Sequence, residues 1–246
     1  DRAESVIEAM AATGARAVLA GGDFTSTATE GEYTQATAFV QSVAASGMQV
    51  FLLPGNHDVY TFEALRARRF ERHFADFVPP DGYPCRIDLP GGTPLVLLPT
   101  VCPNLISSAG RITDAEIEQA SVLIREAAPG PVLVAGHYPV LHRTHAFYTS
   151  PSRRLRNAPA LLHMLRQTGR TILYFAGHVH RFSYVQDAGS SHVFHLTTPA
   201  LFRERGGVHH GGFSEITTNP EGFEILRHFF ADGWQSVVER PRAAVR

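Results

Sequence analysis

The stretches Val132-Leu133-Val134-Ala135-Gly136-His137 and Ile172-Leu173-Tyr174-Phe175-Ala176-Gly177-His178-Val179-His180 follow one pattern. In each, a short apolar run ends in a glycine, and a histidine comes directly after that glycine. Short apolar runs of this length are typical of buried strands. The glycine allows the backbone to turn sharply, so the histidine lies at the carboxyl end of the strand. Open α/β sheets hold their functional sites at this edge.

The same pattern occurs twice more, nearer the amino terminus. The run from Arg16 to Ala20 leads into Gly21-Gly22-Asp23, and the run from Gln49 to Leu53 leads into Pro54-Gly55-Asn56-His57-Asp58. All four loops are expected to converge on one edge of the sheet. They would bring together one carboxylate, one amide oxygen and three imidazoles, from Asp23, Asn56, His137, His178 and His180. Mixed oxygen and nitrogen ligands suit Mn²⁺, Fe or Zn²⁺ without selecting among them.

Helical patterns alternate with these strands, which predicts a largely α/β fold. Two of the helices have capping-box spacings, at Thr29 with Glu32 and at Thr113 with Glu116. The expected helices cover residues 1–13, 29–45, 62–74, 113–127 and 157–167. The further strands are expected near 85–89, 95–98, 182–186, 192–196, 213–217 and 223–229. We expect one domain over residues 1–240 and a frayed end over 241–246.

Composition excludes several classes of protein. The chain has 246 residues, a formal net charge of −1, 44% hydrophobic residues and two cysteines, Cys85 and Cys102. Such a chain is neither intrinsically disordered nor built on a disulfide framework. A near-neutral charge argues against polynucleotide binding, and no apolar run is long enough to span a membrane. We expect a cytoplasmic protein, and its oligomeric state stays open.

The four blocks, in this order, resemble the calcineurin-like metallophosphoesterase superfamily. The segments Gly110-Arg111-Ile112-Thr113 and Arg153-Arg154-Leu155 resemble its bacterial branch, which includes cyclic-nucleotide phosphodiesterases. The resemblance implies an α/β fold of four layers, αββα, in which two mixed β-sheets pack face to face with helices on the outside. It also implies two divalent metal ions. Asp23 would bridge them, Asn56, His137 and His178 would complete one ion, and His180 would bind the other.

The resemblance further implies roles for the two remaining residues of the second block. His57 would protonate or stabilise the leaving oxygen, and Asp58 would orient the imidazole of His57. The implied reaction is hydrolysis of a small phosphate ester, in which a hydroxide held by the metals attacks phosphorus. Phosphodiesters are favoured, and a cyclic nucleotide is one candidate substrate. Phosphomonoesters and nucleotide-linked lipid precursors are the alternatives among enzymes.

One block of the family is absent, the Asp-x-His that closes its first strand. The sequence begins with the helix that should follow this strand. We therefore expect a fragment whose second metal site keeps only Asp23 and His180, and whose central sheet has an exposed edge. The rival interpretation is a metal-binding but catalytically inactive scaffold.

Several other residues are predicted to be ordinary surface. His142 and His145 follow the third block, and His209 and His210 lie in a glycine-rich loop. A surface position is favoured for all four, although either pair could approach a substrate. The cluster Arg66, Arg68, Arg69 and Arg72 is interpreted as the solvated face of one helix.

Overall fold

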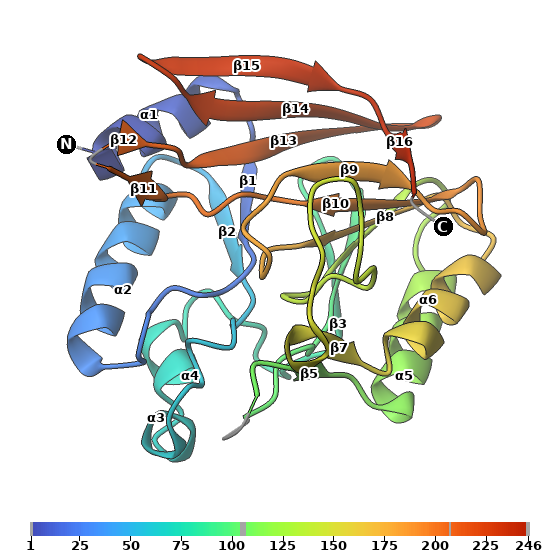
Figure 1. Ribbon diagram of the computed structural model, residues 1–246, viewed down its shortest axis with the longest axis horizontal. Helices are drawn as coiled ribbons and strands as arrows, with labels where there is room; N and C mark the ends of the chain where they lie inside the picture. The colour runs from blue at the N-terminus through green and yellow to red at the C-terminus, as the bar shows by residue number, and fades with distance from the viewer. Residues whose placement is uncertain (1, 104–106, 207, 245–246) are drawn as a thin grey trace.

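The computed structural model describes residues 2–103, 107–206 and 208–244 (Figure 1). The helices are α1 (Arg2–Ala12), α2 (Glu30–Ala45), α3 (Phe62–Arg66), α4 (Arg69–His73), α5 (Asp114–Arg125) and α6 (Ala158–Gln167), with a 3-10 turn at Pro151–Arg153. The strands are β1 (Ala17–Ala20), β2 (Gln49–Leu52), β3 (Cys85–Asp88), β4 (Pro94–Leu97), β5 (Gly110–Arg111), β6 (Val132–Ala135), β7 (Leu155–Arg156), β8 (Ile172–Ala176), β9 (Ser183–Gln186), β10 (Val193–Thr197), β11 (Glu204–Arg205), β12 (Val208–His209), β13 (Gly212–Asn219), β14 (Gly222–Phe230), β15 (Trp234–Glu239) and β16 (Arg242–Ala243).

The largest sheet is mixed and has seven strands in the order β16-β9-β10-β8-β6-β4-β3. Its four central strands, β4, β6, β8 and β10, are parallel, whereas β3 and β9 run antiparallel to their inner neighbours. Strands β4 and β6 are buried along their whole length. This burial explains their continuous apolar sequence, because both faces of the sheet are covered.

A second β layer packs on one face of this sheet. It contains the parallel pair β1–β2 and the antiparallel sheet β13-β14-β15. In the core between the layers, Leu133 and Leu173 of the large sheet belong to one cluster with Phe51 and Ile225 of the second layer. Each fully buried side chain of this kind contributes about 1.5–3 kcal/mol. This core holds the two β layers together.

Helices cover both outer faces (Figure 1). Helices α5 and α6 pack on the large sheet through residues such as Ile124 and Leu161. On the other side, α1 and α2 contact the second layer, where Val18 and Val50 lie against Val43 of α2. The predicted layer order αββα is therefore confirmed. Both capping boxes are confirmed as well.

Two local expectations are wrong. The helix expected over 62–74 is divided into α3 and α4, because Arg68 takes a left-handed backbone conformation with φ of 46°. At the carboxyl end, the expected fraying over 241–246 does not hold for Arg242 and Ala243. These residues pair in parallel with β9 as strand β16, while residues 245–246 lie outside the described part of the chain. Within that part, no helix is long and apolar enough to cross a membrane.

An ion pair with a buried carboxylate connects α6 to the large sheet. Arg166 donates to both carboxylate oxygens of Asp187, at 2.7 and 3.0 Å, and Nε2 of His195 lies 3.3 Å from the same carboxylate. Burial would raise the pKa of Asp187, but His195 and Arg166 outweigh it and hold this pKa below its usual value. The carboxylate therefore stabilises the folded state above the unfolded-state pKa of about 4, and this contribution is lost as the pH falls further.

Asp187→Asn should accordingly lower the free energy of unfolding at pH 7 by about 2 kcal/mol, because two charge-assisted hydrogen bonds are weakened. For a chain of this size the melting temperature should fall by roughly 4–8 °C. Thermal melts at pH 7 and at pH 3 check this, and the difference from wild type should shrink at the lower pH. Asp88→Asn, at an exposed carboxylate 3.7 Å from Arg86, is the control. An equal loss in both variants would contradict the assignment.

Candidate metal centre

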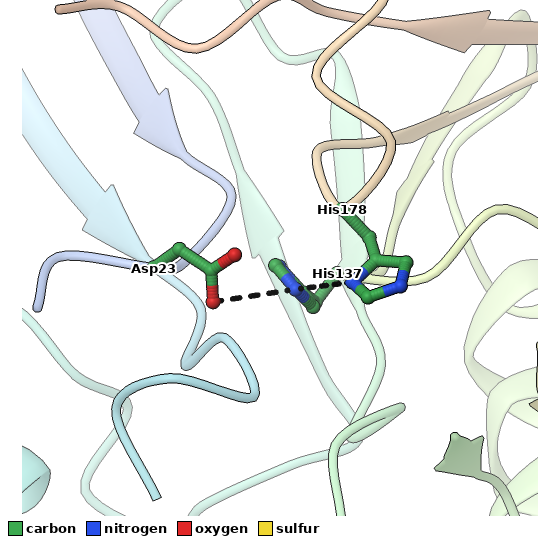
Figure 2. Close-up of side chains that lie close together, drawn as sticks. All are labelled: Asp23, His137 and His178. Atoms are coloured by element: carbon green, nitrogen blue, oxygen red, sulfur yellow. Dashed lines mark hydrogen bonds and ion pairs between the residues drawn. The ribbon is translucent and has the colours of Figure 1, made fainter. Parts of the chain in front are cut away.

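Four loops meet at the carboxyl ends of β1, β2, β6 and β8, as their sequence pattern predicts. Asp23 follows β1, Asn56 follows β2, His137 follows β6 and His178 follows β8. Figure 2 shows Asp23, His137 and His178 directed toward one another. One ligand atom from each of these three residues lies within 4.8 Å of the others. The side-chain oxygen of Asn56 lies between the two imidazoles.

The hydrogen bond on one side of His137 fixes which of its nitrogens is free. Nδ1 lies 2.7 Å from the carbonyl oxygen of Gly21, which can only accept a proton, so Nδ1 donates. The lone pair of Nε2 is then directed at Asn56 Oδ1, 3.1 Å away, and at Asp23 Oδ1, 3.5 Å away. Three acceptor atoms thus face one another, an arrangement that suits a cation.

Nδ1 of His178 faces the same group, and it is an acceptor there in the tautomer that carries its proton on Nε2. It lies 2.9 Å from Asn56 Oδ1 and 3.3 Å from His137 Nε2. The residues present therefore fit a divalent ion through two oxygens and two imidazole nitrogens, which is a donor set for Mn²⁺, Fe or Zn²⁺. His137 and His178 are buried and Asp23 is largely so, which excludes the competing hydration of these groups.

The protonation states also suit a metal. Burial lowers the pKa of His178 to about 3 and also lowers that of His137, so both imidazoles are neutral near pH 7. Burial would raise the pKa of Asp23. The side chains of His137 and His180 in their protonated forms, and the backbone N–H of His57, outweigh this effect and hold the pKa of Asp23 below its usual range. A carboxylate anion with neutral imidazoles is the state that a metal ion requires.

The second oxygen of Asp23 faces away from this group, toward His180. Oδ2 of Asp23 lies 3.5 Å from Nε2 of His180, whereas Oδ1 faces His137. The carboxylate is thus placed between two positions, as a bridging ligand would be. Among the described residues the second position has these two candidate ligands, and His180 is partly exposed.

A cavity of about 1050 Å³ opens beside this second position. Asp23 and His180 line it, together with residues of β1, β2 and β13. Within the described part of the chain, β1 pairs with β2 alone and β13 pairs with β14 alone. Each of the two strands therefore presents an unpaired backbone edge, and apolar side chains such as Leu19 are left partly exposed.

The backbone at the site is held in conformations that are unusual for residues with side chains. Asp23 has φ of 63° and His180 has φ of 50°. Gly55 is needed for a different reason: a Cβ at this position would lie 2.1 Å from both the backbone nitrogen and Oδ1 of Asp23. The loops after β1 and β2 can approach this closely only because residue 55 has no side chain.

Asp58 does not orient His57, contrary to our expectation. Its Oδ2 accepts hydrogen bonds from the backbone nitrogens of Asp23 and Gly55, at 2.9 and 2.8 Å. Its Oδ1 accepts from the backbone nitrogen and the hydroxyl of Thr25, at 3.0 and 3.1 Å. Burial, opposed by these hydrogen bonds, raises the pKa of Asp58 to about 7. Asp58 thus joins the loops after β1 and β2, and it fixes the backbone that presents Asp23.

His57 is oriented by a backbone carbonyl instead. Its Nδ1 lies 2.8 Å from the carbonyl oxygen of Ser26, so Nδ1 donates and Nε2 is the nitrogen left for a substrate. The ring of Tyr60 lies parallel to the imidazole, with centroids 5.8 Å apart. Sequence reasoning missed Ser26 because any residue type supplies a carbonyl. It missed Tyr60 because a single aromatic residue after the block carries no recognisable signal.

The family model for calcineurin-like phosphoesterases matches residues 1–182. The chain belongs to this family. The match includes all four blocks that supply the candidate ligands, and the phosphoesterase fold extends beyond it through β13, β14 and β15. The predicted family is therefore confirmed at the level of the superfamily.

Solved structures with this fold include enzymes from three eukaryotes. A dimetal phosphatase from Danio rerio aligns with a TM-score of 0.60 and 16% identity over 96% of this chain and 88% of that one. A purple acid phosphatase from yellow lupin gives 0.63 and 13%, over 98% and 49%. A 5′-nucleotidase from Candida albicans gives 0.55 and 13%, over 94% and 47%. No curated protein sequence matches this phosphoesterase.

The remaining histidines follow expectation in part. His142, His145 and His210 are exposed, as a surface position requires. The expectation for His209 is wrong. Its ring is buried beside Phe230, and its Nε2 lies 3.0 Å from the carbonyl oxygen of Leu201. A glycine-rich stretch predicts a mobile loop, but here it forms the short pair β11–β12, which is packed by this histidine.

Proposed function

We propose that this phosphoesterase hydrolyses small phosphate esters with two divalent ions, Mn, Fe or Zn, at the candidate metal centre. Asn56, His137 and His178 would hold one ion, His180 would hold the other, and Asp23 would bridge them. The observation that carries the proposal is the convergence of carboxylate, amide and imidazole side chains from four loops around Asp23. When bound, the ions supply positive charge against the phosphoryl group and activate a water molecule.

The residues of the chain itself have three tasks. Asp58 holds the loop that presents Asp23, through hydrogen bonds to the backbone. Gly21 and Ser26 fix the tautomers of His137 and His57 through their carbonyl oxygens. Because Nδ1 of His57 donates to the carbonyl oxygen of Ser26, the proton that Nε2 transfers to the leaving oxygen is that of the doubly protonated imidazolium form. We favour phosphodiesters, and a cyclic nucleotide is one candidate, because two segments resemble those of bacterial cyclic-nucleotide phosphodiesterases.

A second candidate function is metal binding without catalysis. It is favoured by the second ion position, where Asp23 and His180 are the two candidate ligands among the described residues. Metal content after exchange into Mn²⁺ buffer distinguishes the two proposals. About two ions per chain together with phosphodiester hydrolysis support the enzyme. One ion per chain without hydrolysis supports the inactive scaffold.

His57→Ala should retain metal and lower kcat by about 10²-fold for 3′,5′-cyclic AMP, whose alkoxide leaving group needs a proton. The loss should be smaller for bis(p-nitrophenyl) phosphate, because nitrophenolate leaves without one. Steady-state kinetics and metal analysis provide the two readouts. His163→Ala, an exposed histidine on α6, is the matched control. Unchanged turnover of both substrates would remove His57 from the mechanism, and loss of metal would make it a structural residue.

A further inference from the structure

Tyr60 is an exposed aromatic residue at the edge of the candidate metal centre. It follows Asp58 by two positions, and 59% of its surface is exposed. Its ring is parallel to the imidazole of His57 within 6°, with centroids 5.8 Å apart. Tyr60 therefore lies beside the imidazole that we propose protonates the leaving group.

The residues after Tyr60 extend this apolar surface. Phe62 and Leu65 are 50% and 37% exposed. By contrast, Phe70 and Phe74 in the following turns are buried against Tyr33 and Phe24. Single exposed apolar residues are ordinary, but here three lie within six positions of the chain. We call Tyr60, Phe62 and Leu65 the apolar patch; Tyr60 is the member that lies against His57.

The position of His57 determines which part of a substrate this patch would contact. The carbonyl of Ser26 holds the imidazole on one side, and the ring of Tyr60 lies against its face. A substrate whose leaving oxygen reaches Nε2 brings its leaving group next to this imidazole and so within reach of the ring of Tyr60. A flat aromatic group gains most from such a neighbour, because it can stack on the exposed phenol ring, whereas an alkyl group cannot.

We propose that Tyr60 is the leaving-group platform of the site, and that the site selects phosphate esters whose leaving group carries a flat aromatic ring system, such as a nucleoside. This inference rests on the function proposed above and narrows its substrate class. Stacking of a base on one aromatic side chain raises affinity by about 10-fold or more.

Equilibrium binding to the Mn²⁺-loaded protein tests the platform without requiring turnover. Adenosine 5′-monophosphate and ribose 5-phosphate differ only in the base, so the ratio of their Kd values isolates stacking. We expect wild type to bind adenosine 5′-monophosphate about 10-fold more tightly. Tyr60→Ala should bring this ratio to about 1, with little change in the Kd of ribose 5-phosphate. Tyr60→Phe should keep the wild-type ratio, because the aromatic ring rather than the hydroxyl stacks on the base.

Tyr148→Ala is the matched comparison, since Tyr148 is 65% exposed and lies against Arg154 rather than His57. The platform assignment is overturned if Tyr148→Ala, and not Tyr60→Ala, abolishes the preference for adenosine 5′-monophosphate over ribose 5-phosphate. It is also overturned if Tyr60→Ala weakens both compounds equally, or if wild type shows no preference. Asp23→Asn distinguishes a failure of the Tyr60 assignment from a failure of the proposed function. Ribose 5-phosphate binding that depends on Asp23 but not on Tyr60 leaves the function standing, whereas binding that ignores Asp23 overturns both.

Discussion

Asp23→Asn should reduce phosphate-ester hydrolysis by at least about 10³-fold while the fold is preserved, since bound ions supply several kcal/mol of the stabilisation of the transition state. Asparagine matches aspartate in size and tolerates the left-handed conformation that Asp23 adopts, with φ of 63°. The variant therefore removes little besides the negative charge. That charge faces His137 through one oxygen and His180 through the other.

Metal analysis, steady-state kinetics and thermal melts together check this prediction. Metal content should fall with activity, whereas the melting temperature of the metal-free protein should stay within a few degrees of wild type. Asp88→Asn controls for the loss of one carboxylate at an exposed position. Full activity with normal metal content in Asp23→Asn would contradict both the bridging role and the proposed centre.

Asp58→Asn should lower the free energy of unfolding by about 3 kcal/mol, although the hydrogen bonds of the Asp58 carboxylate go to Asp23, Gly55 and Thr25 and not to the imidazole of His57. The carboxylate of Asp58 is the acceptor in all four of its hydrogen bonds. The donors are the backbone nitrogens of Asp23, Gly55 and Thr25 and the hydroxyl of Thr25. An amide has one oxygen and one NH₂ group. The NH₂ group would replace one carboxylate oxygen, so the two donors that face this oxygen would lose their acceptor. Each buried donor without a partner costs about 1–3 kcal/mol.

Melting temperature and metal affinity measure the two consequences of this change. The melting temperature should fall by roughly 6–12 °C. Metal should bind more weakly as well, because the loops that carry Asp23 and Asn56 lose the group that joins them. Thr25→Val, which removes one donor and keeps the carboxylate, should have a smaller effect. Equal stability of Asp58→Asn and wild type would show that the carboxylate does not hold these loops.

The convergence of Asp23, His137 and His178 could be predicted because strand, glycine and polar residue are adjacent in sequence. Burial on both faces makes β6 and β8 continuous in apolar residues, and parallel strands bring the ends of their loops to one edge. The partners of Asp58 and His57 could not be predicted in the same way. They are backbone groups of Gly55 and Ser26, and backbone groups leave no trace in residue type.

The other errors have a similar physical origin. Arg68 interrupts a helical pattern through its backbone conformation, although arginine is a good helix former. His209 is buried because Phe230 and Trp234, distant in sequence, provide a packing surface for its ring. Tertiary packing of this kind overrides local propensity, so local sequence patterns alone do not predict it.

The left-handed backbone conformations of Asp23 and His180 in the candidate metal centre lower the stability of the fold. Each such residue costs of order 1 kcal/mol or more, and glycine would relieve that cost at either position. Glycine would also remove the carboxylate between the two ion positions or the imidazole of the second. Selection for thermostability alone would therefore favour loss of the proposed site, so under the proposed function these two residues represent a stability–activity trade-off.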